Sequence, residues 1–291
     1  IGDEAKSMLG KVPGNIVARR PLKQGVIASY KLTEALIRSL LIKAIGRTRF
    51  FKPEVMISVP AGITSVEERA VIEAAASAGA SRVYLIPEPL AAAVGAKLPI
   101  STSAGNMIAN IGGGTSEIAV ISMNGIVASE SKRIAGDAIN EAIINHIRKR
   151  YNLLIGEQMA ESIKMEIGSA TLLDEPEEME VRGRSASGGL PTSIVINSND
   201  VVEPIKLVLN DIIISIKEVL ENTPPELSSD IIDRGMVLSG GSVMLRNIDE
   251  LFTKATGVPA HVVDDPQDAV ILGIVEAFKH IDAIKRSLKV G

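Results

Sequence analysis

Residues 106–131 constrain the fold of this chain most strongly, because they read as three strands joined by two tight turns. An apolar run leads into Gly-Gly-Gly-Thr at residues 112–115, and an alternating strand follows over residues 117–122. Asn124-Gly125 then predicts a two-residue hairpin turn, since both residue types tolerate positive φ. A strand directly after the glycines differs from the Rossmann and P-loop motifs, which place a helix there.

The first glycine turn has two interpretations. Consecutive glycines leave backbone N–H groups uncovered at a tight bend, and such a concavity suits phosphate oxygens. The ordinary alternative is a structural bend in a hairpin. A second glycine turn at residues 239–242 follows a buried strand over residues 235–238. We expect a helix after this turn, and free N–H groups at its start suit a ligand.

Composition narrows the function classes. The chain has 291 residues, enough for one large or two medium domains, and its net charge of -4 argues against binding nucleic acid through phosphate contacts. Cysteine is absent, and His146, His261 and His280 are scattered, so neither a thiolate site nor a histidine metal site is indicated. No apolar run is long enough to predict a membrane-spanning helix, and no signal peptide is visible.

Glu88 lies in a turn between two prolines, after a strand predicted over residues 82–86 and before a helix of small residues. A carboxylate there is either an ordinary charge favoured by the helix dipole or a group that orients water or accepts a proton. The prolines fix its position, which favours the functional interpretation.

Two further pairs are candidates. Glu161 and Lys164 lie three residues apart on a helix predicted over residues 157–167, where they suit a surface ion pair or hydrogen bonds to a ribose and a base. Gly136 and Asp137 offer either a second bend of N–H groups or a plain helix start.

Phe50 and Phe51 lie in a predicted loop between Arg47, Arg49 and Lys52. Aromatic residues flanked by cations outside a regular element suit a membrane interface. The alternative is that one ring packs into the core at the start of the next strand. At the other end of the chain, residues 267–289 predict one helix of about two dozen residues.

The two glycine turns, with the Glu-Pro turn ahead of them, match a known pattern. The chain resembles the actin, sugar-kinase and heat-shock chaperone superfamily and, over essentially its whole length, the MreB family of bacterial actins. The stretches that carry the resemblance include FKPEVMISVPAGITSVEERA, EPLAAAVGAKL, IGGGTSEIAVIS, RIAGDAINEAI, IGEQMAESIKMEIG and TPPELSSDIIDRGMVLSGG.

This resemblance implies a two-lobed α/β fold of the actin-like ATPases, each lobe a mixed five-stranded sheet flanked by helices, with smaller inserted subdomains. Residues 1–30 would belong to a small subdomain of lobe I and 31–105 to its core. Residues 106–142 and 223–291 would form the lobe II core with the C-terminal helix, and 143–222 its small subdomain.

The implied function is that of a cytoskeletal protein. ATP and Mg2+ would sit in the cleft between the lobes, and weak ATP hydrolysis would accompany polymerisation into double filaments. These filaments would lie in the cytoplasm on the inner face of the plasma membrane and direct cell-wall synthesis and rod cell shape. Implied partners are cell-wall elongation proteins such as RodZ, MreC and MreD.

The resemblance also assigns roles to single residues. Glu88 would orient the attacking water, and Phe50 and Phe51 would form a membrane-inserting loop. The residues implied in nucleotide binding are Gly112, Gly113, Gly114, Thr115, Gly136, Asp137, Glu161, Lys164, Gly240, Gly241, Ser242 and Val243.

The chain departs from the family pattern in three places. The N-terminal hairpin with the first phosphate loop is absent, which leads us to expect a fragment of a longer chain. Asn110 stands where an aspartate normally helps to hold magnesium and its waters, so weaker metal binding and slower hydrolysis are expected. Pro87 and Ser242 replace residues that are usually Glu and Gly.

Two alternatives remain. A nucleotide-binding filament protein with little or no hydrolysis would follow from Asn110 and the missing loop. A different role on the same fold is the other: a sugar kinase would need a sugar pocket with a catalytic aspartate in the first lobe, and a chaperone would need a substrate-binding domain after its ATPase domain. The MreB-type stretches argue against this second alternative.

Overall fold

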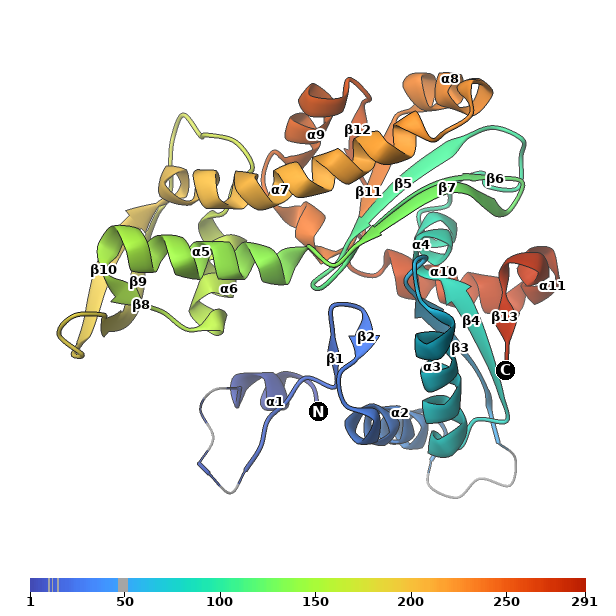
Figure 1. The fold of residues 1–291 in the computed structure, drawn as a ribbon, viewed down its shortest axis with the longest axis horizontal. Coiled ribbons are helices and arrows are strands. Elements are labelled where there is room, and N and C mark those ends of the chain that lie inside the picture. Colours follow the sequence, from blue (N-terminus) through green and yellow to red (C-terminus); the bar gives the residue numbers. More distant parts are fainter. Residues whose placement is uncertain (10, 12, 15, 47–51) are drawn as a thin grey trace.

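The computed structural model describes residues 1–9, 11, 13–14, 16–46 and 52–291 (Figure 1). The helices are α1 (Asp3–Ser7), α2 (Tyr30–Ile45), α3 (Ser65–Ala78), α4 (Glu88–Gly95), α5 (Gly136–Tyr151), α6 (Glu157–Ile167), α7 (Ser198–Glu221), α8 (Pro225–Arg234), α9 (Ile248–Thr256), α10 (Ala269–Lys279) and α11 (Ile281–Ile284), with 3-10 turns η1 (Gly241–Met244) and η2 (Lys285–Ser287). The strands are β1 (Leu22–Lys23), β2 (Val26–Ile27), β3 (Glu54–Val59), β4 (Arg82–Pro87), β5 (Asn106–Ile111), β6 (Ser116–Ser122), β7 (Gly125–Lys132), β8 (Leu153–Leu154), β9 (Glu178–Ser185), β10 (Pro191–Asn197), β11 (Met236–Ser239), β12 (Ala260–Val262) and β13 (Lys289–Val290).

The larger sheet has the strand order β12-β11-β5-β6-β7 among the described residues, and we call the part of the chain built on it lobe II. All residues of β5 and all but the last of β6 are buried. Since successive side chains of a strand point to opposite sides, both faces of these strands are covered. Met107 and Ile111 of β5 join the core cluster that includes Ile139 and Ile143 of α5. Ile108 joins a second cluster with helix α4 on the other face.

The hairpin between β6 and β7 lies one residue earlier than the sequence predicts. Ser122 pairs with Gly125, so the two turn residues are Met123 and Asn124. These two residues have φ values of 50° and 60°. The prediction of Asn124-Gly125 as the turn was therefore wrong, because Gly125 already belongs to the ladder.

The other large body, lobe I, is built on a sheet with the order β13-β4-β3 in the part of the chain that the structure describes. The mixed α/β actin-like class is confirmed, but among the described residues the sheet of this lobe has three strands rather than the implied five.

The chain ends in lobe I, and the prediction of a single helix over residues 267–289 was wrong. α10 ends at Lys279, because His280 leaves helical geometry. After two short turns, β13 pairs antiparallel with β4. Figure 1 shows this end of the chain beside β4.

A smaller sheet of order β10-β9-β8 lies beside α5 and α6 at the far end of lobe II (Figure 1). Its hairpin and the long helix α7 follow directly on one another, and Asn197 caps α7 through a reciprocal pair with Asp200. The assignment of residues 143–222 to a small subdomain of lobe II stays a prediction.

The membrane hypothesis rests on residues that the structure does not describe, since Phe50 and Phe51 lie outside the described residues. Within the described ranges, no helix combines the length and apolar character that crossing a bilayer requires.

Candidate functional site

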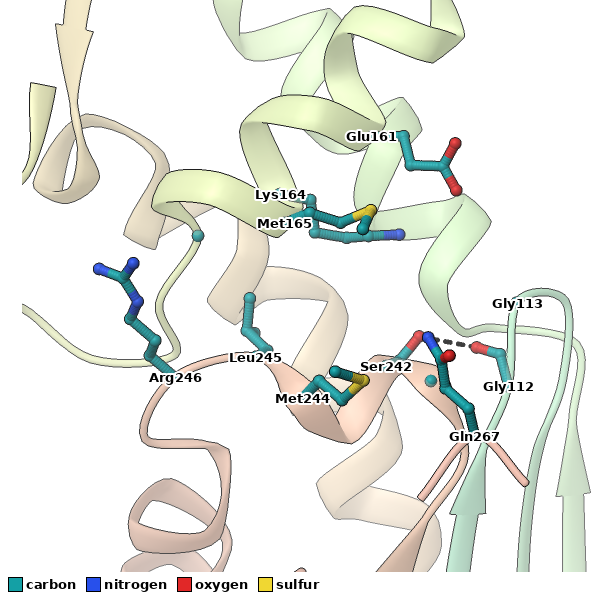
Figure 2. A pocket seen from close by; sticks show the side chains of 12 residues that line it. Gly112, Gly113, Glu161, Lys164, Met165, Ser242, Met244, Leu245, Arg246 and Gln267 are labelled. Carbon is teal, nitrogen blue, oxygen red and sulfur yellow. Dashed lines mark hydrogen bonds between the residues drawn. The ribbon is translucent and has the colours of Figure 1, made fainter. Parts of the chain in front are cut away.

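The two glycine turns and helix α6 meet around one pocket with a volume of about 250 Å3. Figure 2 shows side chains of α6 above this pocket, the η1 turn below it, and the first glycine turn at one side. Of the predicted binding residues, the pocket lining includes Gly112, Gly113, Glu161, Lys164, Gly241 and Ser242. The fold thus brings together residues that lie more than a hundred positions apart.

The first glycine turn has an open approach at its centre. A Cβ added at Gly113 would meet no atom within 4 Å, whereas one at Gly114 would lie 3.0 Å from the Cα of Gln24. The Gly112 N–H donates to the Thr115 carbonyl at 2.9 Å, which closes the turn. Gly113 is therefore the position where a ligand can come closest to the backbone.

Gly136 and Asp137 do not offer free N–H groups, in contrast to one of the two predictions. Their N–H groups donate to the carbonyls of Gly112 and Gly113 at 3.2 Å and 2.7 Å. These donors would otherwise be unpaired at the start of α5, and the glycine turn satisfies them. The Asp137 side chain instead accepts a hydrogen bond from Arg20.

The second glycine turn packs directly on the first strand of the site. Gly240 has φ of 90°, and a Cβ there would lie 2.3 Å from the Ile111 carbonyl oxygen, so a side chain cannot be accommodated. The predicted helix after this turn is instead the short η1 turn, followed by a separate helix. Val243 is buried in the core rather than exposed to the pocket.

Ser242 links the two glycine turns. Its hydroxyl donates to the Gly112 carbonyl at 2.7 Å, as the dashed line in Figure 2 marks. The Ser242 hydroxyl therefore ties the two turns together, which a glycine at this position would not do.

Glu161 and Lys164 do not pair with each other. The Lys164 ammonium donates to the Gly136 carbonyl at 3.1 Å, and the Glu161 carboxylate pairs with Lys6 at 2.9 Å. Burial lowers the pKa of Lys164, and the nearby carboxylates of Glu161 and Asp137 oppose that effect. The interpretation as a mutual surface ion pair was wrong, because each side chain has a partner from another element.

Asn110 holds Glu88 in place. Its amide nitrogen donates to Glu88 Oε1 at 2.7 Å, and its amide oxygen accepts from the Ser239 hydroxyl at 2.9 Å. Burial raises the pKa of Glu88, and the hydrogen bond from Asn110 partly opposes this. Both polar atoms of Asn110 are thus engaged within the protein, between the two glycine turns and the Glu-Pro turn.

Glu117 is a buried carboxyl that the sequence reasoning missed. The residue is 0% exposed, and its two oxygens accept from the Ser131 hydroxyl at 2.6 Å and from the Ala61 N–H at 2.9 Å. Burial is the main cause that raises its pKa to about 7. The available signal was an acidic residue in the otherwise apolar stretch after the glycine turn.

The sequence reasoning also missed part of the pocket wall. These additional lining residues are Met165, Gly168, Met244, Leu245, Arg246 and Gln267 (Figure 2). They come from the end of α6, from η1 and the residues after it, and from the segment after β12. None of these residues belongs to a sequence motif, so their place in the pocket wall could not be predicted before the fold was known.

A family model for the MreB/Mbl protein matches residues 1–286 of the chain. The chain belongs to the MreB/Mbl family. Among curated relatives, the cell shape-determining protein MreB of Escherichia coli strain K12 is 49% identical over 284 residues, which cover 97% of this chain and 82% of that protein. The cell shape-determining protein Mbl of Bacillus subtilis strain 168 is 44% identical over 289 residues, covering 99% and 87%.

Solved structures agree with this MreB/Mbl assignment. MreB5 of Spiroplasma citri bound to ADP matches with a TM-score of 0.92 and 33% identity, covering 98% of this chain and 86% of that one. A MamK double helical filament matches with a TM-score of 0.77 at 21% identity, covering 96% and 85%, which supports the fold alone. The actin-like fold that the sequence predicted is therefore confirmed.

The fit of a magnesium ion to this site is limited. Among the described residues, no group of three or more His, Asp or Glu side chains is arranged to hold a metal ion. Glu88 supplies a carboxylate, but Asn110 turns its N–H toward it. Mg2+ is commonly held by one or two carboxylates together with phosphate oxygens and waters, so an ion arriving with a nucleotide fits better than a resident one.

Proposed function

We propose that this MreB/Mbl chain binds ATP with Mg2+ in the pocket between the glycine turns and polymerises into double filaments. The carrying observation is the convergence of both glycine turns and α6 on one pocket of about 250 Å3. The uncovered backbone at Gly113 suits a phosphate. The match to MreB5 of Spiroplasma citri, solved with ADP and with AMPPNP, supports a nucleotide as the ligand.

The proposed roles of single residues rest on the family resemblance. The first glycine turn, α6 and the second glycine turn line the pocket, whereas Glu88 and Thr115 are not part of its lining. The first glycine turn, with Thr115, receives the phosphates, and Glu161 and Lys164 contact the adenosine together with the second glycine turn. Glu88 orients the attacking water. Phosphoryl transfer depends on positioning and charge neutralisation, which backbone amides, one carboxylate and a bound metal ion supply together.

A substitution at Gly113 tests this proposal. Gly113→Val has room to fold but places a side chain where the phosphates would lie, so ATP affinity is expected to fall at least about tenfold. Equilibrium binding of ATP in the presence of Mg2+ measures it, and sedimentation then reports ATP-dependent assembly. Gly188→Val, in the exposed loop between β9 and β10, is the matched control. A parent chain that neither binds ATP nor sediments with it would refute the proposal.

The second part of the proposal is cellular. The names of the curated relatives support a role in cell shape. On the family resemblance alone, we propose that the filaments lie on the inner face of the plasma membrane and act with partners of the RodZ, MreC and MreD type. The membrane contact is assigned to Phe50 and Phe51 on the sequence alone.

Replacing both phenylalanines by serine is expected to abolish cosedimentation with anionic liposomes. The physical reason is the loss of two apolar rings from a stretch of sequence that also carries Arg47, Arg49 and Lys52. Circular dichroism and ATP binding serve as controls, because neither depends on a membrane contact. Undiminished liposome binding by the double variant would contradict the membrane role and favour the alternative that the rings pack within the protein.

The alternative is a filament protein that binds nucleotide but hydrolyses it little. The amide of Asn110 favours this alternative. Its N–H group donates to Glu88 Oε1, so this oxygen of the carboxylate already has a partner from β5. Phosphate release at saturating ATP separates the two functions.

A further inference from the structure

Among the described residues, three ion pairs connect the N-terminal segment, which precedes β1, to α5 and α6 of lobe II at the edge of the pocket. Arg20 contacts Asp137 at 2.9 Å and Glu157 at 2.5 Å, and Lys6 contacts Glu161 at 2.9 Å. The Gln158 amide also donates to the Lys6 carbonyl at 2.8 Å. All of these contacts join residues more than a hundred positions apart in the sequence.

The N-terminal segment is anchored to lobe I at its other end. The carbonyl of Pro21, directly after Arg20, accepts from the N–H groups of Ala28 and Ser29 and from the Thr33 hydroxyl of α2. Arg20 therefore extends from a fixed point on lobe I to lobe II. Figure 1 shows α1 and the β1–β2 hairpin on the side of the molecule that faces α5 and α6.

The lobe II partners are residues of the proposed nucleotide site or its immediate neighbours. Glu161 lines the pocket, and the backbone of Asp137 is bonded to the first glycine turn. Glu157 lies one helical turn before Glu161 on the same face of α6. The ion pairs contact Oε2 of Glu161 and Oδ2 of Asp137.

We propose that Lys6 and Arg20 form a latch across the edge of this pocket, and that the latch must open before nucleotide enters or leaves. The proposal rests on the proposed nucleotide site. The latch closes over a bound nucleotide rather than competing with it, because Lys6 and Arg20 bring positive charge to a site that receives phosphates. It thereby sets the rate of nucleotide exchange.

The expected size of the effect follows from the exposure of the pairs. The side chains of Arg20, Asp137 and Glu157 are 41%, 39% and 50% exposed, so each pair is weak on its own. Acting together, they are expected to slow ATP release by about fivefold. Salt is expected to speed release, because screening weakens exposed ion pairs.

The test measures release of radiolabelled ATP from the full chain after a chase with excess unlabelled ATP. Lys6→Gln/Arg20→Gln is expected to release ATP about fivefold faster than the parent and to lose most of the salt dependence. Glu157→Gln, which alters no proposed nucleotide ligand, should give a smaller increase that is not additive with Arg20→Gln. The matched control is Arg19→Gln, since Arg19 is exposed and has no ion pair among the described residues.

A second measurement, made without nucleotide, tests whether Lys6 and Arg20 hold the N-terminal segment against α6. Because the chain has no cysteine, spin labels can be placed at Lys11→Cys and Glu166→Cys, on the two sides of the latch. The distance distribution between the labels is expected to broaden in Lys6→Gln/Arg20→Gln. The latch alone is overturned if the distance distribution is the same in the parent and the double variant. It is also overturned if the parent chain retains ATP but both proteins release it at the same rate. Failure of the parent chain to retain ATP overturns the proposed function and the latch with it.

Discussion

Asn110→Asp is expected to destabilise the metal-free chain by about 3 kcal/mol at neutral pH, because it leaves a buried charge without a partner. Asn110 is 1% exposed and donates to Glu88 across 2.7 Å. An aspartate would replace that donor with an acceptor, so two carboxyl groups would face each other. One of them must then bind a proton or a cation.

The substitution is therefore expected to make stability depend on Mg2+. Urea unfolding in chelator should show the loss, and Mg2+ with ATP should recover much of it, because a cation can bind between the two carboxylates. Phosphate release is expected to rise in the same variant. The loss should shrink at low pH, where the pair retains a proton.

Asn106→Asp is a matched control on the same strand. Asn106 is 5% exposed, and its amide donates to the carbonyls of Ala104 and Pro99 rather than to a carboxylate. The change should also destabilise the chain, but Mg2+ should not restore it. An Asn110→Asp variant as stable in chelator as in Mg2+ would contradict the assignment of Asn110 to the metal-assisting position.

Glu117→Gln is expected to stabilise the chain at alkaline pH by up to about 3 kcal/mol, the equivalent of a pKa raised from 4.5 to about 7. Burial favours the neutral carboxyl in the folded state. Below pH 4.5 both states are protonated, and burial has no ionisation cost. Between pH 4.5 and 7 only the unfolded state ionises, so stability falls as pH rises and the full cost is present above pH 7.

Glutamine keeps the hydrogen bonds without this cost. Its oxygen can accept from the Ala61 N–H, and its nitrogen can donate to the Ser131 hydroxyl, the same partners that Glu117 has. The stability difference from the parent should therefore grow from near zero at about pH 4.5 to its maximum near pH 8.

Chemical unfolding across this pH range measures the difference. Glu73→Gln, which makes the same substitution at an exposed site on α3, is the control for the chemical change itself. A constant difference for Glu117→Gln would show that the carboxyl is already ionised in the folded chain.

The local sequence was sufficient for the strands around the first glycine turn and for helix α6, whose bounds match the prediction. Strand periodicity and glycine positions report what one segment requires of its own backbone. The same local rules placed the β6–β7 turn one residue late and merged α10, α11 and β13 into one helix. Those endings depend on pairing with another strand, β4 in the second case, which local periodicity does not encode.

The sequence by itself therefore determined the family, the actin-like fold class and the presence of two glycine turns. Only the tertiary structure decided how the site is held together: Asn110 between Glu88 and Ser239, Glu117 buried against Ala61, and Arg20 across to α5 and α6. The physical reason is that a side chain's charge state and hydrogen bonds depend on its burial and its nearest polar groups. In this chain those groups come from segments far apart in the sequence.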